Sequence, residues 1–349
     1  MSQSPNPPKP PPPSRPTRPA PAAPVPTSAD VARLAGVSRA TVSYVLNNAE
    51  AVRISEPTRR KVREAAEELG YVPHAAARTL RAGHTRIVLL PTSHVPAGPL
   101  YGTFLGDLQW ALRRLDYTVV QYGSLGLSGD QAARAWAELR PVAVISFGET
   151  LLSARNVATL KRAGAKAVLT LGPVGVPGAH ALVMDQREVG AVAAAHLVAR
   201  GHRRIGVVVP EEPGLELFSA PRLAGARSVP GAEVEALPLA YTEPSAGALA
   251  RRFRSLGLDA VFAYNDEYAM LLMRALQDEG LRVPDDVAVM GADDLLLGRL
   301  LRPRLSTVRI EMPTGEHLAA LVDRAVREPE EAPEQHGPMA AVAVVRESG

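Results

Sequence analysis

A short predicted helix carries polar side chains opposite an apolar face, an arrangement typical of a helix that contacts DNA. The stretch from residue 30 to 46 reads DVARLAGVSRATVSYVL, and Val42, Val45 and Leu46 recur at the spacing of one apolar helix face. Ser38 is a good N-cap for this helix. The outward-facing residues are Arg39, Ala40, Thr41 and Tyr44.

The residues before this helix predict a partner helix and a tight turn. Val31 and Leu34 lie three apart and are expected to share one face of the first helix, and Gly36 supplies the backbone freedom for the chain to reverse. Two helices joined in this way form a helix-turn-helix, in which the second helix lies in the major groove. Taken alone, the same pattern also fits an ordinary helical hairpin.

A third helix follows, with Ser55 as its N-cap and Pro57 in its first turn. Its apolar face is expected to comprise Val62, Ala65, Ala66 and Leu69. Residues 27–73 therefore predict a small three-helix domain. Residues 1–26 are proline-rich and nearly devoid of large apolar side chains, so we expect a disordered tail.

Charge is distributed unevenly along the chain. The net charge of the 349 residues is only +3, but residues 27–86 hold ten basic and six acidic side chains, and the preceding tail adds Lys9, Arg15 and Arg18 without an acid. A basic N-terminal region followed by a mildly acidic remainder indicates that the N-terminal region binds a polyanion. A solvated charged face would give the same imbalance of charge.

Several classes of function lack their sequence signals. The chain has no cysteine, so thiolate metal sites and cysteine nucleophiles are excluded. The eight histidines do not fall at metal-ligand spacing, and no phosphate-binding loop, dinucleotide fingerprint or nucleophile elbow is found. We therefore expect no cofactor, no metal and no enzymatic activity. No signal peptide or membrane-spanning run is found, so a soluble, cytoplasmic protein is expected.

Four segments make the resemblance to a known family specific. DVARLAGVS, TVSYVLN, TRRKVREAAEELGY and ARTLR occur in this order between Asp30 and Arg81. Together they resemble the DNA-binding headpiece and hinge of the lactose-repressor (LacI/GalR) family of bacterial transcription regulators. The resemblance implies that Arg39, Ala40 and Tyr44 read bases. It also implies that, within the hinge and linker at residues 74–85, His74–Arg81 forms a helix on operator DNA and inserts Leu80 into a base step.

The complete set of expected DNA contacts follows from this resemblance. It comprises Ser38, Arg39, Ala40, Thr41, Tyr44, Asn47, His74, Ala77, Arg78, Leu80 and Arg81. Two positions depart from the family pattern, since many members have Arg where Tyr44 stands and Asn where His74 stands. The first departure removes a possible guanine contact, so the operator sequence is left open.

Alternating strand and helix signals fill residues 86–349. Apolar strands such as IVLLP and PVAVISFG are separated by short helices, a pattern that predicts parallel sheets covered on both faces. The pattern restarts after a proline- and glycine-rich break, so we expect two doubly wound lobes and a ligand cleft between them. The first lobe is expected at about residues 86–183 and 311–326, and the second at about residues 184–310 and 327–349.

The same family resemblance continues through this body in HLVARGHRRIGVV, AYNDEYAM, GLRVPDDVAVMGADD, RLSTVR and the closing VVRES, the expected last strand. It implies an effector-binding and dimerisation core similar to periplasmic sugar-binding proteins. By match to the family's motifs, the cleft candidates are Arg222, Asp293, Asn265, Asp185 and Ser93. Each acidic residue could instead cap a helix, as is expected for Asp266. The nearby aromatic residues Tyr101, Phe104, Phe218 and Tyr264 are expected in the core rather than against a ligand.

The sequence thus predicts a homodimeric repressor that binds a palindromic operator under the control of a small molecule, with a sugar or sugar-like effector favoured. The alternatives are a regulator whose core no longer binds a sugar, a sugar- or nucleotide-acting enzyme on the same fold, and a solute-binding protein. The sequence leaves open which small molecule is the effector, whether it acts as an inducer or a corepressor, and what the proline-rich tail does.

Overall fold

The computed structural model describes residues 25–46, 53–72, 85–92, 98–123, 126–147, 152–329, 331–337 and 339–349. The chain divides into two compact units, Met1–Arg81 and Ala82–Gly349. The first unit contains helices α1 (Ser28–Ala35), α2 (Arg39–Leu46) and α3 (Glu56–Glu68). They enclose a small core that includes Val31, Val42, Val45 and Val62. Gly36 takes a φ of +66° at the reversal between α1 and α2, so the predicted helix-turn-helix is present.

The expectation that Val31 and Leu34 share one face of α1 is wrong, because Val31 is buried whereas 46% of the Leu34 surface is exposed. The core side of α1 is made instead by Val31, Ala32 and Ala35. α1 packs against both α2 and α3. The small alanine side chains permit that close approach, whereas Leu34 lies on the side that turns away.

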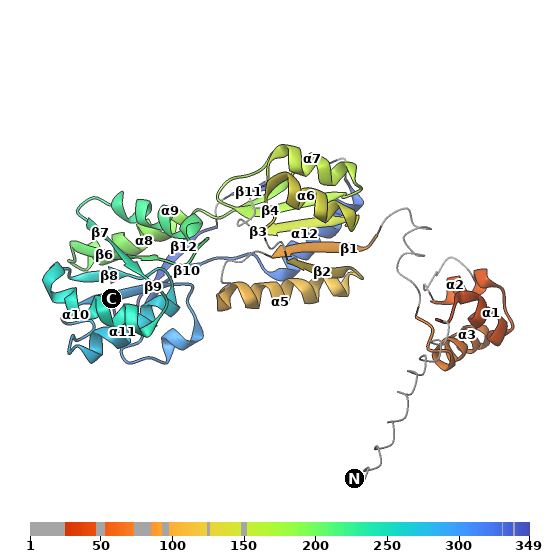
Figure 1. Ribbon diagram of the computed structural model, residues 1–349, viewed down its shortest axis with the longest axis horizontal. Helices are drawn as coiled ribbons and strands as arrows, with labels where there is room; N and C mark the ends of the chain where they lie inside the picture. The colour runs from red at the N-terminus through yellow and green to blue at the C-terminus, as the bar shows by residue number, and fades with distance from the viewer. Residues whose placement is uncertain are drawn as a thin grey trace, which may run out of the picture. The chain divides into compact units, whose positions relative to one another are not determined.

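The second unit contains two six-stranded sheets, each covered by helices on both faces (Figure 1). The first sheet has the order β11-β5-β4-β3-β1-β2. Its strands are β1 (Ile87–Thr92), β2 (Thr118–Gly123), β3 (Ala143–Phe147), β4 (Ala167–Gly172), β5 (His180–Val183) and β11 (Gln335–His336). Helices α5 (Pro99–Arg114) and α12 (Gly315–Arg327) pack together on one face, and α6 (Gly129–Glu138) and α7 (Ala154–Arg162) on the other.

The second sheet has the order β12-β10-β9-β8-β6-β7. Its strands are β6 (Arg204–Pro210), β7 (Glu233–Leu239), β8 (Ala260–Phe262), β9 (Ala288–Ala292), β10 (Ser306–Ile310) and β12 (Ala341–Val344). Helices α8 (Gln186–Ala199) and α9 (Glu216–Arg227) cover one face, and α10 (Glu243–Leu256) and α11 (Asp266–Asp278) the other. A short 3-10 helix, η1 (Leu296–Arg299), follows β9. Among the described strands, every pairing is parallel except that of β10 with β12.

The expected lobe boundaries differ from the structure near the C-terminus. The chain passes from the first sheet to the second after β5, returns after β10, and crosses again only after β11. Residues 335–336 therefore belong to the first lobe, where they pair with residues 181–182, and not to the second. A two-residue strand carries no periodic signal that a sequence could reveal. The last strand also lies earlier than expected, at Ala341–Val344.

Helix α9 starts at Glu216 and continues through Pro221. Proline inside a helix removes one backbone donor and usually marks a boundary, so this helix runs past a residue that would ordinarily end it.

Candidate functional site

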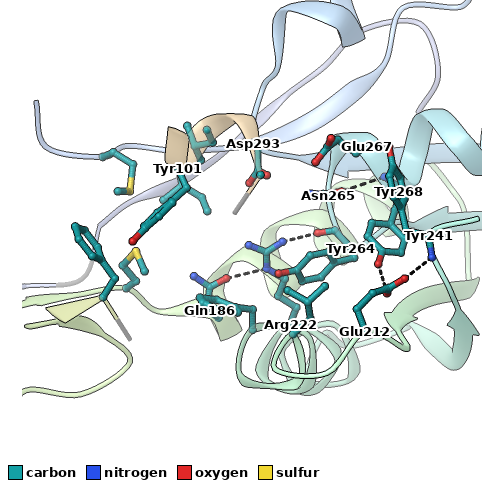
Figure 2. A pocket seen from close by; sticks show the side chains of 18 of the residues that line it. Tyr101, Gln186, Glu212, Arg222, Tyr241, Tyr264, Asn265, Glu267, Tyr268 and Asp293 are labelled. Atoms are coloured by element: carbon teal, nitrogen blue, oxygen red, sulfur yellow. Dashed lines mark hydrogen bonds between the residues drawn. The ribbon is translucent and has the colours of Figure 1, made fainter. Parts of the chain in front are cut away.

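A cavity of ≈ 310 Å³ opens between the two lobes of the second unit, at the carboxyl ends of the parallel strands. Its lining residues are Gly98, Leu100, Tyr101, Phe147, Leu171, Met184, Gln186, Glu212, Leu215, Phe218, Arg222, Tyr241, Tyr264, Asn265, Glu267, Tyr268, Asp293, Ile310 and Met312. Polar side chains of the second lobe gather around Arg222 (Figure 2). Such a concave, largely apolar space with a few convergent polar groups is the usual form of a small-molecule site.

Arg222 is buried and held on three sides. Its Nε donates to Oε1 of Gln186 at 2.8 Å, and its Nη1 donates to the carbonyl oxygen of Tyr264. The guanidinium carbon also lies 4.8 Å from the centre of the Tyr264 ring, a cation–π arrangement. These contacts fix the plane of the guanidinium and use two of its five N–H donors.

The backbone below Arg222 is set by a close crossing of α8 and α9. A Cβ added at Gly190 of α8 would lie 2.6 Å from the carbonyl carbon of Arg222, and one added at Gly225 would lie 2.8 Å from that of Arg187. Ordinary carbon contacts are about 3.5–4.0 Å. Only glycine at both positions allows the helices to approach this closely, so the crossing decides where Arg222 lies.

Asp293 follows β9 directly and faces the cavity with a backbone conformation unusual for its type. Its φ is +102°, and its N–H donates to the carbonyl oxygen of Val308 at 2.8 Å, which holds the residue in this conformation. Burial raises the pKa of Asp293, and the charge of Arg222 opposes that shift. Non-glycine residues in the left-handed region are costly and concentrate at binding sites.

Asn265 and the two acidic residues after it begin α11. The side chain of Asn265 lines the cavity and caps the helix, accepting a bond from the Tyr268 N–H at 3.0 Å. Asp266 does not line the cavity; it is buried and accepts hydrogen bonds from Thr307 Oγ1 at 2.6 Å and from the Leu295 N–H at 2.7 Å. Burial raises the pKa of Asp266 to about 7, against the effect of these two bonds.

Glu212 links the segments that follow β6 and β7 to helix α11 at one end of the cavity. It accepts a hydrogen bond from the Tyr268 hydroxyl and another, at 2.6 Å, from the Tyr241 N–H. Burial disfavours the Glu212 carboxylate, but these hydrogen bonds outweigh it and lower the pKa of the group. The Tyr268 ring in turn contacts Tyr241 and Tyr264, with ring centres 5.0 and 5.5 Å away.

In the first unit, the outward face of α2 is accessible. Ser38 Oγ accepts a bond from the Thr41 N–H at 3.1 Å, as expected of an N-cap, and Arg39, Ala40 and Tyr44 are exposed. The other expected DNA contacts lie outside the described residues: Asn47, His74, Ala77, Arg78, Leu80 and Arg81.

Comparison with known proteins covers both units. Residues 27–74 match bacterial regulatory proteins of the lacI family, and residues 194–349 match a periplasmic binding protein-like domain. The HTH-type transcriptional regulator CelR of Thermobifida fusca is 33% identical over 87% of this chain and 93% of its own length. The chain belongs to the LacI family of bacterial transcriptional regulators. The regulator GalR of Escherichia coli (strain K12) is 30% identical over 88% of this chain and 91% of its own.

Solved structures of the LacI family have the same architecture. The CelR–cellobiose complex is 28% identical with a TM-score of 0.60, covering 93% of this chain and 100% of its own. A LacI-family regulator from Silicibacter pomeroyi, 24% identical, gives a TM-score of 0.75 over 92% of this chain and 98% of its own, which shows the fold. The curated relatives are named as regulators rather than enzymes.

The structure brings together three of the expected cleft residues of this LacI-family protein, Arg222, Asn265 and Asp293. Asp185 is placed differently: it is exposed and caps α8, accepting a bond from the Arg187 N–H at 2.9 Å. Ser93 lies outside the described residues.

The expectation for the aromatic residues is partly wrong. Tyr101, Phe218 and Tyr264 line the cavity, and only Phe104 lies solely in the core. Six further polar or aromatic lining residues were missed, namely Phe147, Gln186, Glu212, Tyr241, Glu267 and Tyr268. Glu212 and Tyr241 lie two residues past the ends of β6 and β7, a position that could have indicated them.

No group of metal-ligating side chains is found among the residues that the structure describes. Within the same residues, no helix is both long and apolar enough to span a bilayer.

Proposed function

We propose that this LacI-family regulator is a homodimeric repressor whose affinity for a palindromic operator is set by a sugar or sugar-like effector in the cavity between the lobes. The observation that carries the proposal is the convergence of Arg222, Asn265 and Asp293 in that cavity. A carboxylate, an amide and a guanidinium can bind neighbouring hydroxyl groups in pairs. The complex of the relative CelR with cellobiose supports a sugar as the effector class.

An exposed apolar segment supports the dimer. Leu296, Leu297 and Leu300, in and beside η1, expose 69%, 58% and 65% of their surfaces. Neighbouring exposed leucines of this kind are typical of a surface that a second subunit covers. In a twofold dimer the same segment of each subunit contributes to the contact, and two headpieces then meet two operator half-sites. DNA binding would keep the protein in the cytoplasm, at the nucleoid.

The cavity and this segment are joined by adjacent residues, which offers a route for regulation. Asp294, next to Asp293, pairs with Arg299 at 3.1 Å and with Arg346. Asp266, next to Asn265, holds the Leu295 N–H. A ligand that changes the position of Asn265 or Asp293 therefore changes the residues that hold η1, and the coupling cannot exceed its differential affinity for the two states.

The test is operator binding measured with and without candidate effectors. Operator fragments are selected from genomic DNA with the full chain, and their affinity is followed by fluorescence anisotropy with glucose, galactose or cellobiose added. We expect one sugar to change the affinity by about 5- to 150-fold, the usual range of allosteric coupling. Asp293→Asn should abolish the sugar's effect while leaving operator affinity without sugar intact.

Two variants test the expected DNA contacts. Leu80→Ala should weaken specific operator binding and leave sugar affinity unchanged, because its expected role is to wedge a base step. Arg39→Ala should weaken binding at particular base pairs. Unchanged operator selection by both variants would contradict the assignment, and operator binding that no sugar alters would favour a regulator that no longer senses sugars.

A further inference from the structure

Negative charge predominates in the cavity between the lobes. Its described lining includes one guanidinium and three carboxylates, those of Arg222, Glu212, Glu267 and Asp293. The stretches 93–97 and 148–151, which lie outside the described residues, contain no lysine or arginine that could reverse this balance. A ligand that enters the cavity therefore meets more negative than positive charge.

Arg222 only partly offsets the nearest carboxylate. Two of its N–H donors are already used by Gln186 and by the carbonyl oxygen of Tyr264. Burial raises the pKa of Asp293 by more than the charge of Arg222 lowers it. The Asp293 carboxylate would therefore gain from a further positive charge.

Glu267 and Asp293 repel one another across the same part of the cavity. Both side chains line it and lie on one side of it in Figure 2. Burial raises the pKa of Glu267, and the charge of Asp293 raises it further. The Glu267 carboxylate also reaches the first lobe, because a Cβ added at Gly98 would lie 3.4 Å from its Oε2. The two carboxylates thus border the space that a ligand between the lobes would fill.

Tyrosine rings line the cavity beside these carboxylates. The centre of the Tyr268 ring lies 5.0 Å from that of Tyr241 and 5.5 Å from that of Tyr264. Burial raises the pKa of Tyr241, and the charge of Glu267 raises it further, so this carboxylate lies near the Tyr241 side chain. Aromatic faces attract cations, and the Tyr264 ring already does so with Arg222.

These surroundings favour a cationic ligand over a neutral one. A neutral sugar displaces the water that screens Glu267 from Asp293, which strengthens their repulsion or forces one of them to take up a proton. An ammonium group instead offsets the negative charge and supplies three hydrogen-bond donors. Hydrogen bonds between ionised groups are also the stronger ones.

We infer that the effector is an amino sugar whose protonated amine binds between Glu267 and Asp293, beside the rings of Tyr241 and Tyr268. Its hydroxyl groups bind the remaining donors of Arg222. This inference rests on the proposed function and narrows its ligand class from sugars in general to sugars that carry a positive charge.

The experiment compares matched ligands by isothermal titration calorimetry on the full chain, at about pH 6.5, which keeps an amine of ordinary pKa protonated. Glucose, glucosamine and N-acetylglucosamine form one series, and the corresponding galactose compounds form another. A third series compares cellobiose with the disaccharide of glucosamine that has the same linkage and with its N-acetylated form. In the series that binds, we expect the amine to bind at least about tenfold more tightly than the neutral sugar, equivalent to about 1.4 kcal/mol.

A variant that removes one charge tests where the amine lies. Glu267→Gln keeps the size of a half-buried side chain, so the fold should tolerate it. It should reduce the preference for the amine to about twofold or less and change the affinity for the neutral sugar little. The matched control is Glu235→Gln, which removes an exposed carboxylate of the same lobe outside the cavity lining and should keep the full preference.

The outcomes separate this inference from the function beneath it. If the neutral or N-acetylated sugar binds as tightly as the amine, the inference is overturned and a sugar-responsive regulator remains. A preference for the amine that Glu267→Gln does not reduce, or that Glu235→Gln reduces equally, also overturns it, because the amine then does not bind at Glu267. No binding of any of these compounds removes the proposed function together with the inference.

Discussion

Substituting Gly190 by alanine should destabilise the second unit, although alanine is the better helix former. The new Cβ would lie 2.6 Å from the carbonyl carbon and 2.9 Å from the Cα of Arg222. The carbonyl oxygen of Arg222 would lie closer still. Carbon contacts need about 3.5 Å, so α8 and α9 must separate by more than about 1 Å along their crossing. Overpacking of this kind costs about 3 kcal/mol where the neighbour is backbone that cannot rotate away. The gain in helix propensity, about 1 kcal/mol, leaves a net loss of about 2 kcal/mol.

The assay is thermal unfolding of the full chain followed by circular dichroism. For a unit of this size, a loss of about 2 kcal/mol lowers Tm by roughly 4–8 °C. The matched control is Gly106→Ala in α5, where an added Cβ meets no atom within 4 Å, and it should raise Tm slightly through propensity alone. If Gly190→Ala were as stable as Gly106→Ala, the close crossing of α8 and α9 would not exist as described. Any effector should also bind Gly190→Ala more weakly, because the clash displaces the backbone of Arg222.

Four further substitutions test separate parts of the structure. Burial raises the pKa of Asp266 to about 7 in the folded chain. The pKa of the unfolded chain is about 3.9, so between these values the folded chain binds more protons than the unfolded chain. Stability should therefore fall as the pH rises from about 4 to about 7. Asp266→Asn should remove this loss from a plot of Tm against pH. If the plots of the variant and the unchanged protein ran parallel, the raised pKa of Asp266 would be contradicted. Tyr268→Phe removes the hydroxyl donor to Glu212 and should cost about 1.5 kcal/mol in urea unfolding; no loss would mean that water replaces the bond. Leu34→Ala should change headpiece stability by less than about 0.5 kcal/mol because Leu34 is exposed. Val31→Ala, in the core, should cost about 1–2 kcal/mol, and the reverse order would refute the α1 packing.

The sequence alone determined the architecture, because the patterns that carry it are local. Spacing around Val42, Val45 and Val62 predicted helices whose apolar faces form the small core. Buried strands such as β9 are continuous apolar runs, so the parallel sheets could be predicted as well. The expected positions of Arg222, Asn265 and Asp293 in the cleft came from the resemblance of short segments to motifs of the LacI family. Such motifs need no knowledge of distant residues.

Only the tertiary structure decided how the cavity is lined and which neighbours hold its polar groups. Glu212 and Tyr268 lie 56 residues apart, and no local pattern indicates that they share a hydrogen bond. Gly190 and Gly225 read as ordinary helical glycines until the crossing of α8 and α9 shows what a side chain would meet. The cavity likewise combines residues of both lobes because the chain crosses between them. Side chains that are remote in sequence then face one another across a space that no single segment defines.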